Sequence, residues 1–331
     1  MEIIEVEIMI NIAILGFGVV GSGTYYNAVE NAELIEKRVG DSIRVKKIVD
    51  ILDFPNHPAP ELLTKDFNEV MKDPSISIVV ETIGGVRVAY DFTKAALMGG
   101  KSVVTSNKEL VAKHGVELTE IAKKNNVKYL FEASVGGGIP IIRPLKQCLA
   151  ANDITEIYGI LNGTSNYILT KMRKDGMSFD AALKEAQAKG YAENNPAADI
   201  EGHDTKRKIC ILAWVASGTM IDSEDIPTKG ITEITKKDME KAKAAGCVIK
   251  LIGRAKLTGG KVECSVGPEL ISLSEPLALV DDVFNAIVVE GNFVGTTMFY
   301  GHGAGSRATA SAVMGDVMEI ARGIVAHRKH A

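Results

Sequence analysis

Strand-like and helix-like hydrophobic patterns alternate through about the first 140 residues of the chain. Strands that alternate with helices predict βαβ units, which build a parallel sheet with helices on both faces. Residues 1–142 are therefore expected to form a doubly wound α/β domain. The opening run "MEIIEVEIMI" alternates acidic and apolar residues as an edge or first strand does, and Met9 is an alternative start. The strand-like runs lie at 10–15, 43–51, 75–84, 101–107 and 127–134, with helix-like segments at 22–40, 66–73, 88–100 and 114–126.

The pattern changes after "GGGIPIIRPL", and the remainder predicts a second, α+β domain over residues 143–303. A strand, a turn and a helix are expected within 153–176, an amphipathic helix at 178–190 and a longer helix at 203–216. Two strand-like runs at 248–257 and 261–270 lie close together, as in an antiparallel sheet. From 304 a glycine turn leads into a helix of small residues to about 325. We expect this helix to pack on the first domain, so that 304–331 completes it, with "AHRKHA" as a frayed basic tail.

Composition is typical of a soluble protein with two hydrophobic cores. The chain has 331 residues, 46% of them hydrophobic, and a net charge of -4 without a basic stripe, so no nucleic-acid partner is expected. Its four cysteines are far apart and form no CxxC pair, which gives neither a zinc site nor a disulfide framework and fits the cytoplasm. No apolar run approaches the roughly 20 residues that span a bilayer.

A glycine loop follows the first strand and precedes the first helix. Gly16, Gly18 and Gly21 form G-x-G-x-x-G, with Phe17, Val19 and Val20 between them. Glycine permits the tight turn and lets the backbone approach a pyrophosphate at the helix N-terminus. At the first βα turn of a βαβ unit, this pattern predicts a Rossmann-type dinucleotide site rather than a turn needed only for packing.

The segment after the second strand bears on the choice between NAD and NADP. It reads "VDILDFPNH", with Asp50 and Asp53 and no Arg. An acidic residue there binds the ribose hydroxyls of NAD, whereas an Arg accepts the extra phosphate of NADP. The sequence thus favours NAD, or use of both.

Two further loops lie at carboxyl ends of expected strands and are candidates for the same dinucleotide site, because ligands of open α/β sheets bind at that edge. "ETIGG" contains Thr82, and "TSNKELV" contains Ser106 and Lys108. Thr82 and Ser106 offer hydrogen bonds, and Lys108 is either a surface lysine or a charge placed at the ligand.

The stretch "EASVGGGIP", residues 132–140, ends a strand with three glycines and Pro140. It is either a hinge between domains or, because a carboxylate precedes exposed backbone carbonyls, a ligand set for a hard cation. The two interpretations are compatible.

Residues 189–214, "KGYAENNPAADIEGHDTKRKICILAW", set charged side chains around a Pro-broken turn before an apolar helix. Asp204 and Lys208 are spaced i,i+4 and so share one helical face. Taken alone, such a pair is usually solvated and contributes about 0.2–0.5 kcal/mol.

The same segment resembles the signature of the homoserine dehydrogenase family. The match has the form Ala-xxx-Gly-Tyr-Ala-xx-Asn-Pro-xx-Asp-Ile-x-Gly-x-Asp-xxx-Lys over residues 186–208. "GFGVVGSG", "TSNKELVA", "FEASVGGGIPII", "ILNGTSNYIL" and "GHGAGSRATASAVMGD" recur in that family in this order, so the resemblance covers nearly the whole chain. It implies an enzyme that interconverts L-aspartate 4-semialdehyde and L-homoserine with NAD(P)H, on the route to threonine, methionine and isoleucine.

The resemblance also implies roles for individual residues. Lys208 is the catalytic lysine, and Lys108 is a second lysine at the reacting oxygen and near the nicotinamide. Glu193 and Asp199 fall where the family binds the amino acid, and Asp204 belongs to the same polar cluster. The chemistry agrees, because an ammonium stabilises the alkoxide that hydride addition creates and carboxylates attract the substrate's α-ammonium.

Three further features are implied by the family alone. Gly190 falls at a cofactor contact. A monovalent cation, usually sodium, is bound by Glu132 and by backbone carbonyls of Val135, Gly137 and Ile139. The second domain pairs its sheet across a two-fold axis, which predicts a homodimer.

Two departures from the family pattern stand out. Leu52 lies where the family often has an Arg, which puts the usual NADP preference in question, and the chain ends at Ala331, without the C-terminal regulatory domain of many relatives. Two other functions make different demands on the sequence. Aspartate semialdehyde dehydrogenase needs an activated cysteine, and all four cysteines have core-like or strand-like neighbours. A nucleotide sensor without chemistry would not need Lys208 or Glu193.

Overall fold

The structure is a computed structural model that describes residues 9–55 and 57–330. The strand expected within residues 1–8 lies outside the described residues. The described chain divides into two compact units, one formed by the residues up to Ser134 together with those from Gly305 onward, and the other by Val135–Ala304.

The first unit is built on a six-stranded sheet in which every pairing is parallel. The strand order β3-β2-β1-β4-β5-β6 is that of a dinucleotide-binding fold and confirms the expected doubly wound sheet. The central strands are almost wholly buried because helices cover both faces, which explains their continuous apolar runs. The strands are β1 (Ile10–Leu15), β2 (Ile43–Val49), β3 (Leu63–Thr64), β4 (Ile76–Glu81), β5 (Ser102–Thr105) and β6 (Tyr129–Leu130).

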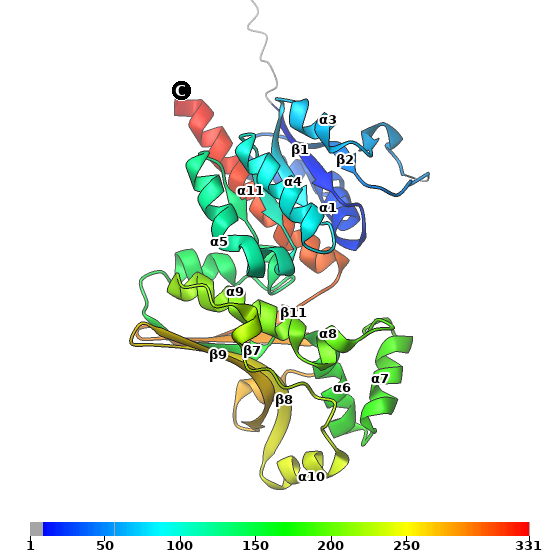
Figure 1. The fold of residues 1–331 in the computed structure, drawn as a ribbon, viewed down its shortest axis with the longest axis vertical. Helices are drawn as coiled ribbons and strands as arrows, with labels where there is room; N and C mark the ends of the chain where they lie inside the picture. The colour runs from blue at the N-terminus through cyan, green and yellow to red at the C-terminus, as the bar shows by residue number, and fades with distance from the viewer. Residues whose placement is uncertain (1–8, 56, 331) are drawn as a thin grey trace, which may run out of the picture. The chain divides into compact units, whose positions relative to one another are not determined.

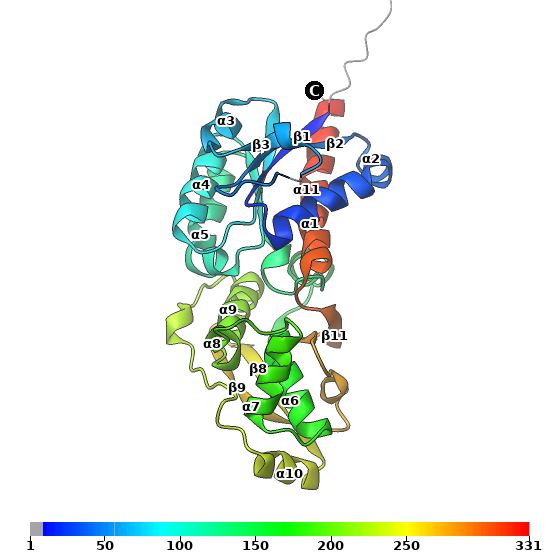
Figure 2. The ribbon, with the colours of Figure 1, turned by 90° about the vertical axis from the view of Figure 1, so that its right-hand side faces the viewer.

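Helices lie on both sides of this sheet, with α4 and α5 on one face and α1 and α11 on the other (Figures 1 and 2). The single helix expected at 22–40 is wrong in one respect, because the chain breaks at Asn31, a residue of low helix propensity. The helices are α1 (Val19–Glu30), α2 (Ala32–Val39), α3 (Phe67–Lys72), α4 (Arg87–Met98), α5 (Lys108–Lys124) and α11 (Ser306–His330), with short turns η1 (Pro60–Leu62) and η2 (Glu132–Ser134).

Helix α11 returns the end of the chain to the first unit, as the small-residue pattern predicts. A Cβ on Gly23 of α1 would lie 2.6 Å from Ser306 Oγ and 3.2 Å from Ala310 Cβ, so the two helices need small residues where they meet. Its buried Val313, Val317 and Ala321 join the core under β1 and β2. The frayed tail expected from residue 326 is wrong for the described part, since α11 continues to His330.

The second unit contains a five-stranded antiparallel sheet of order β11-β10-β7-β8-β9. Strands β8 (Cys247–Thr258) and β9 (Lys261–Ser272) confirm the expected antiparallel pair, and β7 (Ile154–Ile160) confirms the strand before "LNGTSNYIL". The hairpin of β10 (Phe284–Gly291) and β11 (Gly295–His302) was not among the sequence expectations.

Helix α9 (His203–Ser217) packs directly on this sheet, against β8, β9 and β7. A Cβ on Gly253 of β8 would lie 2.8 Å from Thr205 Cγ2 and 3.0 Å from Leu161 Cδ1, so glycine allows the helix region to approach the strand. The unit's helices are α6 (Gly163–Lys174), α7 (Phe179–Ala188), α8 (Ala197–Ile200), α9 (His203–Ser217) and α10 (Lys236–Ala244), with turns η3 (Pro144–Cys148), η4 (Ser223–Asp225) and η5 (Pro276–Leu279).

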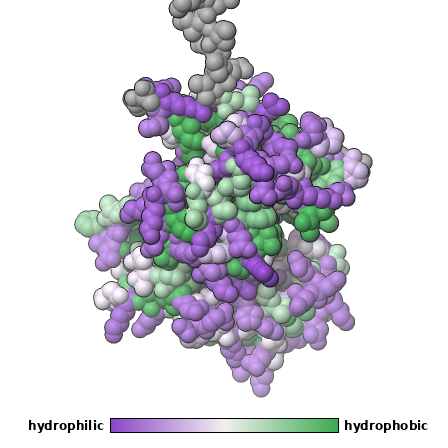
Figure 3. Space-filling model, turned by 45° about the horizontal axis from the view of Figure 1, so that its top comes forward, coloured by the Kyte–Doolittle hydropathy of each residue, from purple (hydrophilic) through white to green (hydrophobic). Residues whose placement is uncertain are grey.

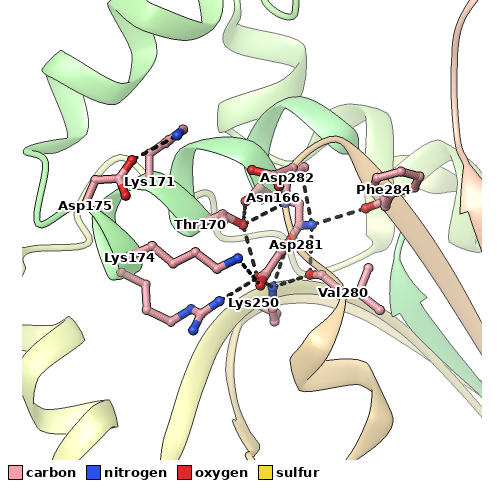
Figure 4. Close-up of polar contacts among 11 residues, drawn as sticks. Asn166, Thr170, Lys171, Lys174, Asp175, Lys250, Val280, Asp281, Asp282 and Phe284 are labelled. Atoms are coloured by element: carbon pink, nitrogen blue, oxygen red, sulfur yellow. Dashed lines mark hydrogen bonds and ion pairs between the residues drawn. The ribbon is translucent and has the colours of Figure 1, made fainter.

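A buried polar cluster ties η5 and the start of β10 to α6 and β8 (Figure 4). The ammonium of Lys250, only 1% exposed, donates to Asn166 Oδ1 and lies 3.1 Å from Asp281 Oδ1. Asp281 also pairs with Arg173 at 2.6 Å and Lys174 at 2.9 Å. Three cations therefore share one carboxylate, and the loop that precedes β10 is held in place by charge as well as by packing.

The surface is mixed in polarity. Hydrophilic side chains cover much of the face drawn in Figure 3, with smaller apolar areas between them. Among the residues that the structure describes, no helix combines the length and the apolar character that crossing a membrane requires.

Candidate active site

The glycine loop adopts the close geometry that its sequence predicts. Gly16 has a φ of 87°, and a Cβ there would lie 2.9 Å from the carbonyl oxygen of Thr82. A Cβ on Gly21 would lie only 1.9 Å from the carbonyl oxygen of Gly16, so neither position accepts a side chain. Around Gly18 a Cβ would meet nothing within 4 Å, which leaves this side of the loop open at the N-terminus of α1.

The remaining loop residues differ in what they contact. Phe17 is buried, and its ring makes an edge contact with Tyr25 at 6.0 Å. Val19 is 67% exposed, and its carbonyl accepts a hydrogen bond from Ser306 Oγ at 2.8 Å. The carbonyl of Val20 accepts one from Thr24 within α1. Phe17 thus anchors the loop while Val19 faces outward.

Asp50 and Thr82, which follow the two strands that flank β1, fasten the glycine loop from both sides. The backbone N–H of Phe17 donates to Asp50 Oδ2 at 2.6 Å, and that of Leu52 donates to Asp50 Oδ1 at 2.8 Å. Thr82 Oγ1 donates to the carbonyls of Leu15 at 2.9 Å and Gly16 at 2.8 Å. The structure thus brings Gly16, Asp50 and Thr82 together at the carboxyl edge of the sheet, where ligands of open α/β folds bind.

The loop after β5 supplies two further candidates for the cofactor site. Ser106 follows β5, and its N–H donates to the carbonyl of Glu81 at 3.4 Å. Lys108 is the first residue of α5, whose N-cap is Asn107. Leu52, where the family often has Arg, is 64% exposed. Asp53 pairs with Lys65 in an exposed salt bridge, so it does not join Asp50.

In the second unit, the structure turns the i,i+4 pair of α9 into a buried ion pair. Lys208 Nζ lies 2.7 Å from Asp204 Oδ2, with side chains 8% and 5% exposed, and donates to the carbonyl of Leu161 at 2.7 Å. The solvated alternative is therefore wrong. Two oxygens fix the direction of this ammonium, as positioning a reactive group requires.

Asn162 connects this pair to Asp199. Its Nδ2 donates to Asp199 Oδ1 at 2.7 Å and to Asp204 Oδ2 at 2.9 Å, while its Oδ1 caps α6 by accepting from Ser165 N–H. Burial, followed by repulsion from Asp204, raises the pKa of Asp199. The amide of Asn162 thus holds the carboxylates of Asp199 and Asp204 next to each other, although their like charges repel.

The remaining candidates of this unit lie in the loop between α7 and α8. Gly190 has a φ of 73° and open space around its Cβ position, and Glu193 is exposed. Tyr191 is held by its carbonyl, which accepts from Thr164 Oγ1 at 2.6 Å, and by an edge contact with the ring of Tyr167. Helix α6 thus supports the backbone beside Glu193 through Tyr191.

The residues of the cation candidate are mostly buried. Glu132 lies in η2 of the first unit, where its N–H donates to Asp316 Oδ2 at 2.8 Å. Val135 and Ile139 are also buried, and the N–H of Ile139 donates to the carbonyl of Gly136 at 2.9 Å. Gly137 has a φ of 57°, and a Cβ there would lie 2.4 Å from the carbonyl oxygen of Gly303. The tight turn requires glycine at position 137. The ligand atoms expected for the cation are carboxylate and carbonyl oxygens, which suit a hard cation.

Two of the cysteines lie in surroundings that disfavour a nucleophilic thiolate. Among the residues that the structure describes, Cys148, Cys210, Cys247 and Cys264 are all free thiols. Burial raises the pKa of Cys210 to about 11 and that of Cys264 to about 12. Activated cysteines have lowered pKa values, so these two do not fit a thiol-based aldehyde oxidation.

A parallel sheet with a glycine loop at its carboxyl edge, together with a second unit that buries an oriented lysine, defines a dinucleotide-dependent oxidoreductase. A family model for the NAD-binding domain of homoserine dehydrogenase matches residues 16–132, and the homoserine dehydrogenase model matches residues 140–318. The chain belongs to the homoserine dehydrogenase family of NAD(P)-dependent enzymes.

Individual relatives agree along almost the whole chain. The homoserine dehydrogenase of Bacillus subtilis is 42% identical over 318 residues, covering 94% of this chain and 72% of that protein. The crystal structure of a homoserine dehydrogenase from Thiobacillus denitrificans has a TM-score of 0.91 at 43% identity, covering 96% of this chain and 74% of that one. A hyperthermophilic archaeal homoserine dehydrogenase in complex with NADPH has a TM-score of 0.80 at 31% identity, covering 94% and 97%.

Two contributors to the site were not expected from the sequence. Asn162 and the carbonyl of Leu161 hold Asp199, Asp204 and Lys208, yet neither was singled out. Both lie in the stretch "ILNGTSNYIL", whose match to the family was itself the available signal.

Proposed function

We propose that Lys208 is the catalytic residue of homoserine dehydrogenase chemistry in this chain. The observation that carries the proposal is the buried ammonium of Lys208, held at 2.7 Å by both Asp204 Oδ2 and the carbonyl of Leu161. A cation fixed in a water-poor site stabilises negative charge that develops on a reacting oxygen.

The reaction interconverts L-aspartate 4-semialdehyde and L-homoserine. A nicotinamide dinucleotide, held at the glycine loop, would supply the hydride for reduction and would accept it in oxidation. As the new C–H bond forms, the aldehyde oxygen gains negative charge, and Lys208 donates the proton that completes the hydroxyl. In oxidation the same amine accepts the hydroxyl proton, and proton transfer of this kind contributes about 10²- to 10⁴-fold to the rate.

The substrate's amino-acid end calls for carboxylates. We assign Asp199 and Glu193 to its α-ammonium, and Lys108 to the reacting oxygen beside the nicotinamide. Asp204 orients Lys208, and Asn162 holds Asp204 and Asp199 together. The assignments of Glu193 and Lys108 are supported by the family resemblance. That of Asp199 is also supported by its hydrogen bond to Asn162.

The proposed cofactor is NAD, or either dinucleotide. The glycine loop and the tight packing at Gly16 and Gly21 fit a pyrophosphate, and we assign Asp50, which holds the loop at Phe17, to the ribose hydroxyls. The exposed Leu52 offers no charge to a 2′-phosphate. The proposed cofactor contacts are Gly16, Phe17, Gly18, Val19, Val20, Gly21, Asp50, Thr82, Ser106, Lys108 and Gly190.

Three further proposals come from the family resemblance. A monovalent cation, which we propose to be sodium, would be held by Glu132 and the carbonyls of Val135, Gly137 and Ile139, and would fix the backbone there. Exposed apolar side chains in the second unit, including Met298 and Tyr300 on β11, support a homodimer. Free cysteines support a cytoplasmic enzyme of threonine, methionine and isoleucine biosynthesis.

Replacement of Lys208 by Met tests the main proposal. Lys208→Met removes the ammonium while keeping the length of the side chain, and turnover is expected to fall by about 10³-fold with dinucleotide binding retained. Lys206→Met is the matched control, because Lys206 lies on the same helix, is also buried, and pairs with Glu224 at 3.2 Å.

The assay follows nicotinamide absorbance with L-homoserine and either NAD or NADP, in sodium and in potassium buffers. Turnover by wild type and Lys206→Met, but not by Lys208→Met, supports the proposal. Equal turnover by the two variants, with both folded by circular dichroism, contradicts it.

A further inference from the structure

Glu81 is a fully buried carboxylate at the carboxyl end of the central strand β4. Thr105 Oγ1 donates to its Oε2 at 2.5 Å, and the backbone N–H of Ile83 donates to its Oε1 at 2.6 Å. Both oxygens therefore accept short hydrogen bonds inside the first unit, one from each of two adjacent strand ends. The proposed chemistry at Lys208 makes no use of this group.

The same hydrogen bonds lead to the start of helix α5. Thr105 Oγ1 accepts from the N–H of Asn107 at 2.9 Å, and Asn107 Nδ2 donates to the carbonyls of Ile83 at 3.0 Å and Gly85 at 2.7 Å. Asn107 Oδ1 caps α5 by accepting from Leu110 N–H at 3.0 Å. Glu81, Thr105 and Asn107 thus form a closed network that joins the loop after β4 to the loop after β5.

Lys108 follows Asn107 directly and is the first residue of α5. Its backbone position is set by the cap, and the cap is set by the network that ends on Glu81. A shift of about 1 Å in such a group is enough to lower turnover by about 10²-fold. We propose that Glu81 is a positioning residue, which fixes the loop from Thr105 to Lys108 and thereby places Lys108 for its part in the reaction. This inference rests on the role assigned to Lys108 above.

A neutral side chain would be the simpler choice if the network only held the fold together, because burying a carboxylate is costly. Burial raises the pKa of Glu81 to about 7, although hydrogen bonds from Thr105, Ile83 and Asn107 lower it in part. Only the ionised carboxylate accepts both donors without competition from a proton of its own. The network is therefore complete above neutral pH and weakened below it.

Neighbouring elements contribute other titratable groups. Tyr129 of β6 is buried, its hydroxyl has no hydrogen-bond partner, and Glu81 adds to the rise in its pKa. Lys108 and the N-terminus of α5 bring positive charge toward the network. Helix α11 packs on β4 and β5, and its buried Asp316 accepts from Glu132 N–H. Ionised Glu81 thus has positive charge on the α5 side and apolar or acidic groups elsewhere.

Two substitutions disrupt the hydrogen bond between Thr105 and Glu81, one at each partner. Glu81→Gln keeps the size and removes the charge, and Thr105→Val keeps the shape and removes the hydroxyl. Each is expected to lower kcat/KM by about tenfold, as the loss of one buried hydrogen bond implies. Thr105→Ser restores the hydroxyl and should recover activity to within about twofold of wild type, a rescue on the scale of that one bond.

The pH profile separates positioning from simple stability. In wild type, kcat/KM should rise as Glu81 ionises near pH 7, and this rise should be missing in Glu81→Gln. Glu117→Gln is the control, because it removes the same charge from an exposed site on α5, the helix that begins at Lys108. A profile for Glu81→Gln that keeps the wild-type rise would overturn the proposal.

A double-mutant cycle with Lys108→Ala decides whether Glu81 acts through Lys108. If it does, Glu81→Gln and Thr105→Val should each lower kcat/KM by less than about twofold in the Lys108→Ala background. The effects of residues that act as a unit are not additive. A full tenfold loss in that background, in folded protein, would overturn the inference. Normal turnover by Lys108→Ala alone would instead refute the role proposed for Lys108, which is a distinguishable result.

Discussion

The Asp204 carboxylate and the Lys208 ammonium lie 2.7 Å apart, one turn apart on α9, with both side chains less than a tenth exposed. An ion pair so buried is strong only while both partners are present, since an unpaired buried charge is costly. Asp204 therefore supplies the counter-charge that the buried ammonium of Lys208 needs.

Asp204→Asn should lower kcat by about 10- to 100-fold, a loss of roughly 1.4–2.8 kcal/mol of transition-state stabilisation. Because the ammonium loses its counter-charge, the alkaline limb of the aldehyde-reducing profile should move to lower pH. Glu201→Gln is a suitable control, since Glu201 is exposed and pairs with His203. An unchanged alkaline limb in Asp204→Asn would contradict this account.

Asn162→Asp separates the two tasks of Asn162. The variant keeps an oxygen to cap α6 but loses the amide that bridges Asp199 and Asp204. It also adds a third carboxyl group, which should raise the pKa of Asp199 further and shift the acid limb of kcat/KM to higher pH.

The control for capping is Ser178→Ala, which removes the N-cap of α7 and should cost about 1 kcal/mol of stability without moving the profile. Thermal unfolding and the pH dependence of kcat/KM are measured on both variants. If Asn162→Asp lost stability alone, with a wild-type acid limb, the bridging role would be refuted.

Leu52→Arg should shift the preference toward NADP. An exposed guanidinium just after Asp50 can pair with a 2′-phosphate, and one such bond raises the NADP:NAD ratio of kcat/KM by about tenfold. Met98→Arg is the control, because Met98 is similarly exposed but ends α4 before β5 begins, at the opposite edge of the sheet. A ratio that changed equally in both variants would point to a general effect of charge.

Asp281→Asn should destabilise the second unit by about 2 kcal/mol, since it leaves the buried Lys250 without its counter-charge. Asp175→Asn, which breaks the more exposed pair with Lys171 in Figure 4, should cost less than about 1 kcal/mol. Chemical unfolding at neutral pH compares the two. Equal losses would show that the buried cluster contributes no more than a surface pair.

The same cluster predicts a pH dependence of unfolding. Burial raises the pKa of Asp281, but hydrogen bonds from Lys174, Arg173 and Lys250 outweigh it and hold the pKa at about 2, below the usual 3.8. A lowered carboxyl pKa stabilises the fold above the unfolded value and is lost as pH falls through the folded value. The difference in free energy of unfolding between wild type and Asp281→Asn should therefore shrink between about pH 4 and pH 2.

Local signals in the sequence were sufficient for the sheet of the first unit and for the glycine loop. Continuous apolar strands, glycines at fixed spacing and helix periodicity are read from neighbouring residues, and β1 with α1 has the predicted arrangement. The break at Asn31 was missed because periodicity continues across it while one residue leaves the helical conformation.

Contacts between distant residues account for what sequence patterns left out. Asn162 meets Asp199 and Asp204 at separations of 37 and 42 residues, and Glu81 meets Thr105 at 24. The sequence spacing does not show that Asn162 bridges two carboxylates in addition to capping a helix. It also does not show that Glu81, at the end of a strand, is a buried hydrogen-bonded carboxylate. The buried state of Lys208 likewise depends on Leu161, which only the folded second unit supplies.

Helix α11 gives the first unit a particular order of completion during synthesis. The ribosome releases β1 to β6 first, then the whole of Val135–Ala304, and only afterwards the helix that covers the core of β1 and β2. Until then the nascent chain exposes the apolar surface that Val313, Val317 and Ala321 later cover. The first unit can therefore begin to fold before the second, but its core is completed only after the second unit has been synthesised.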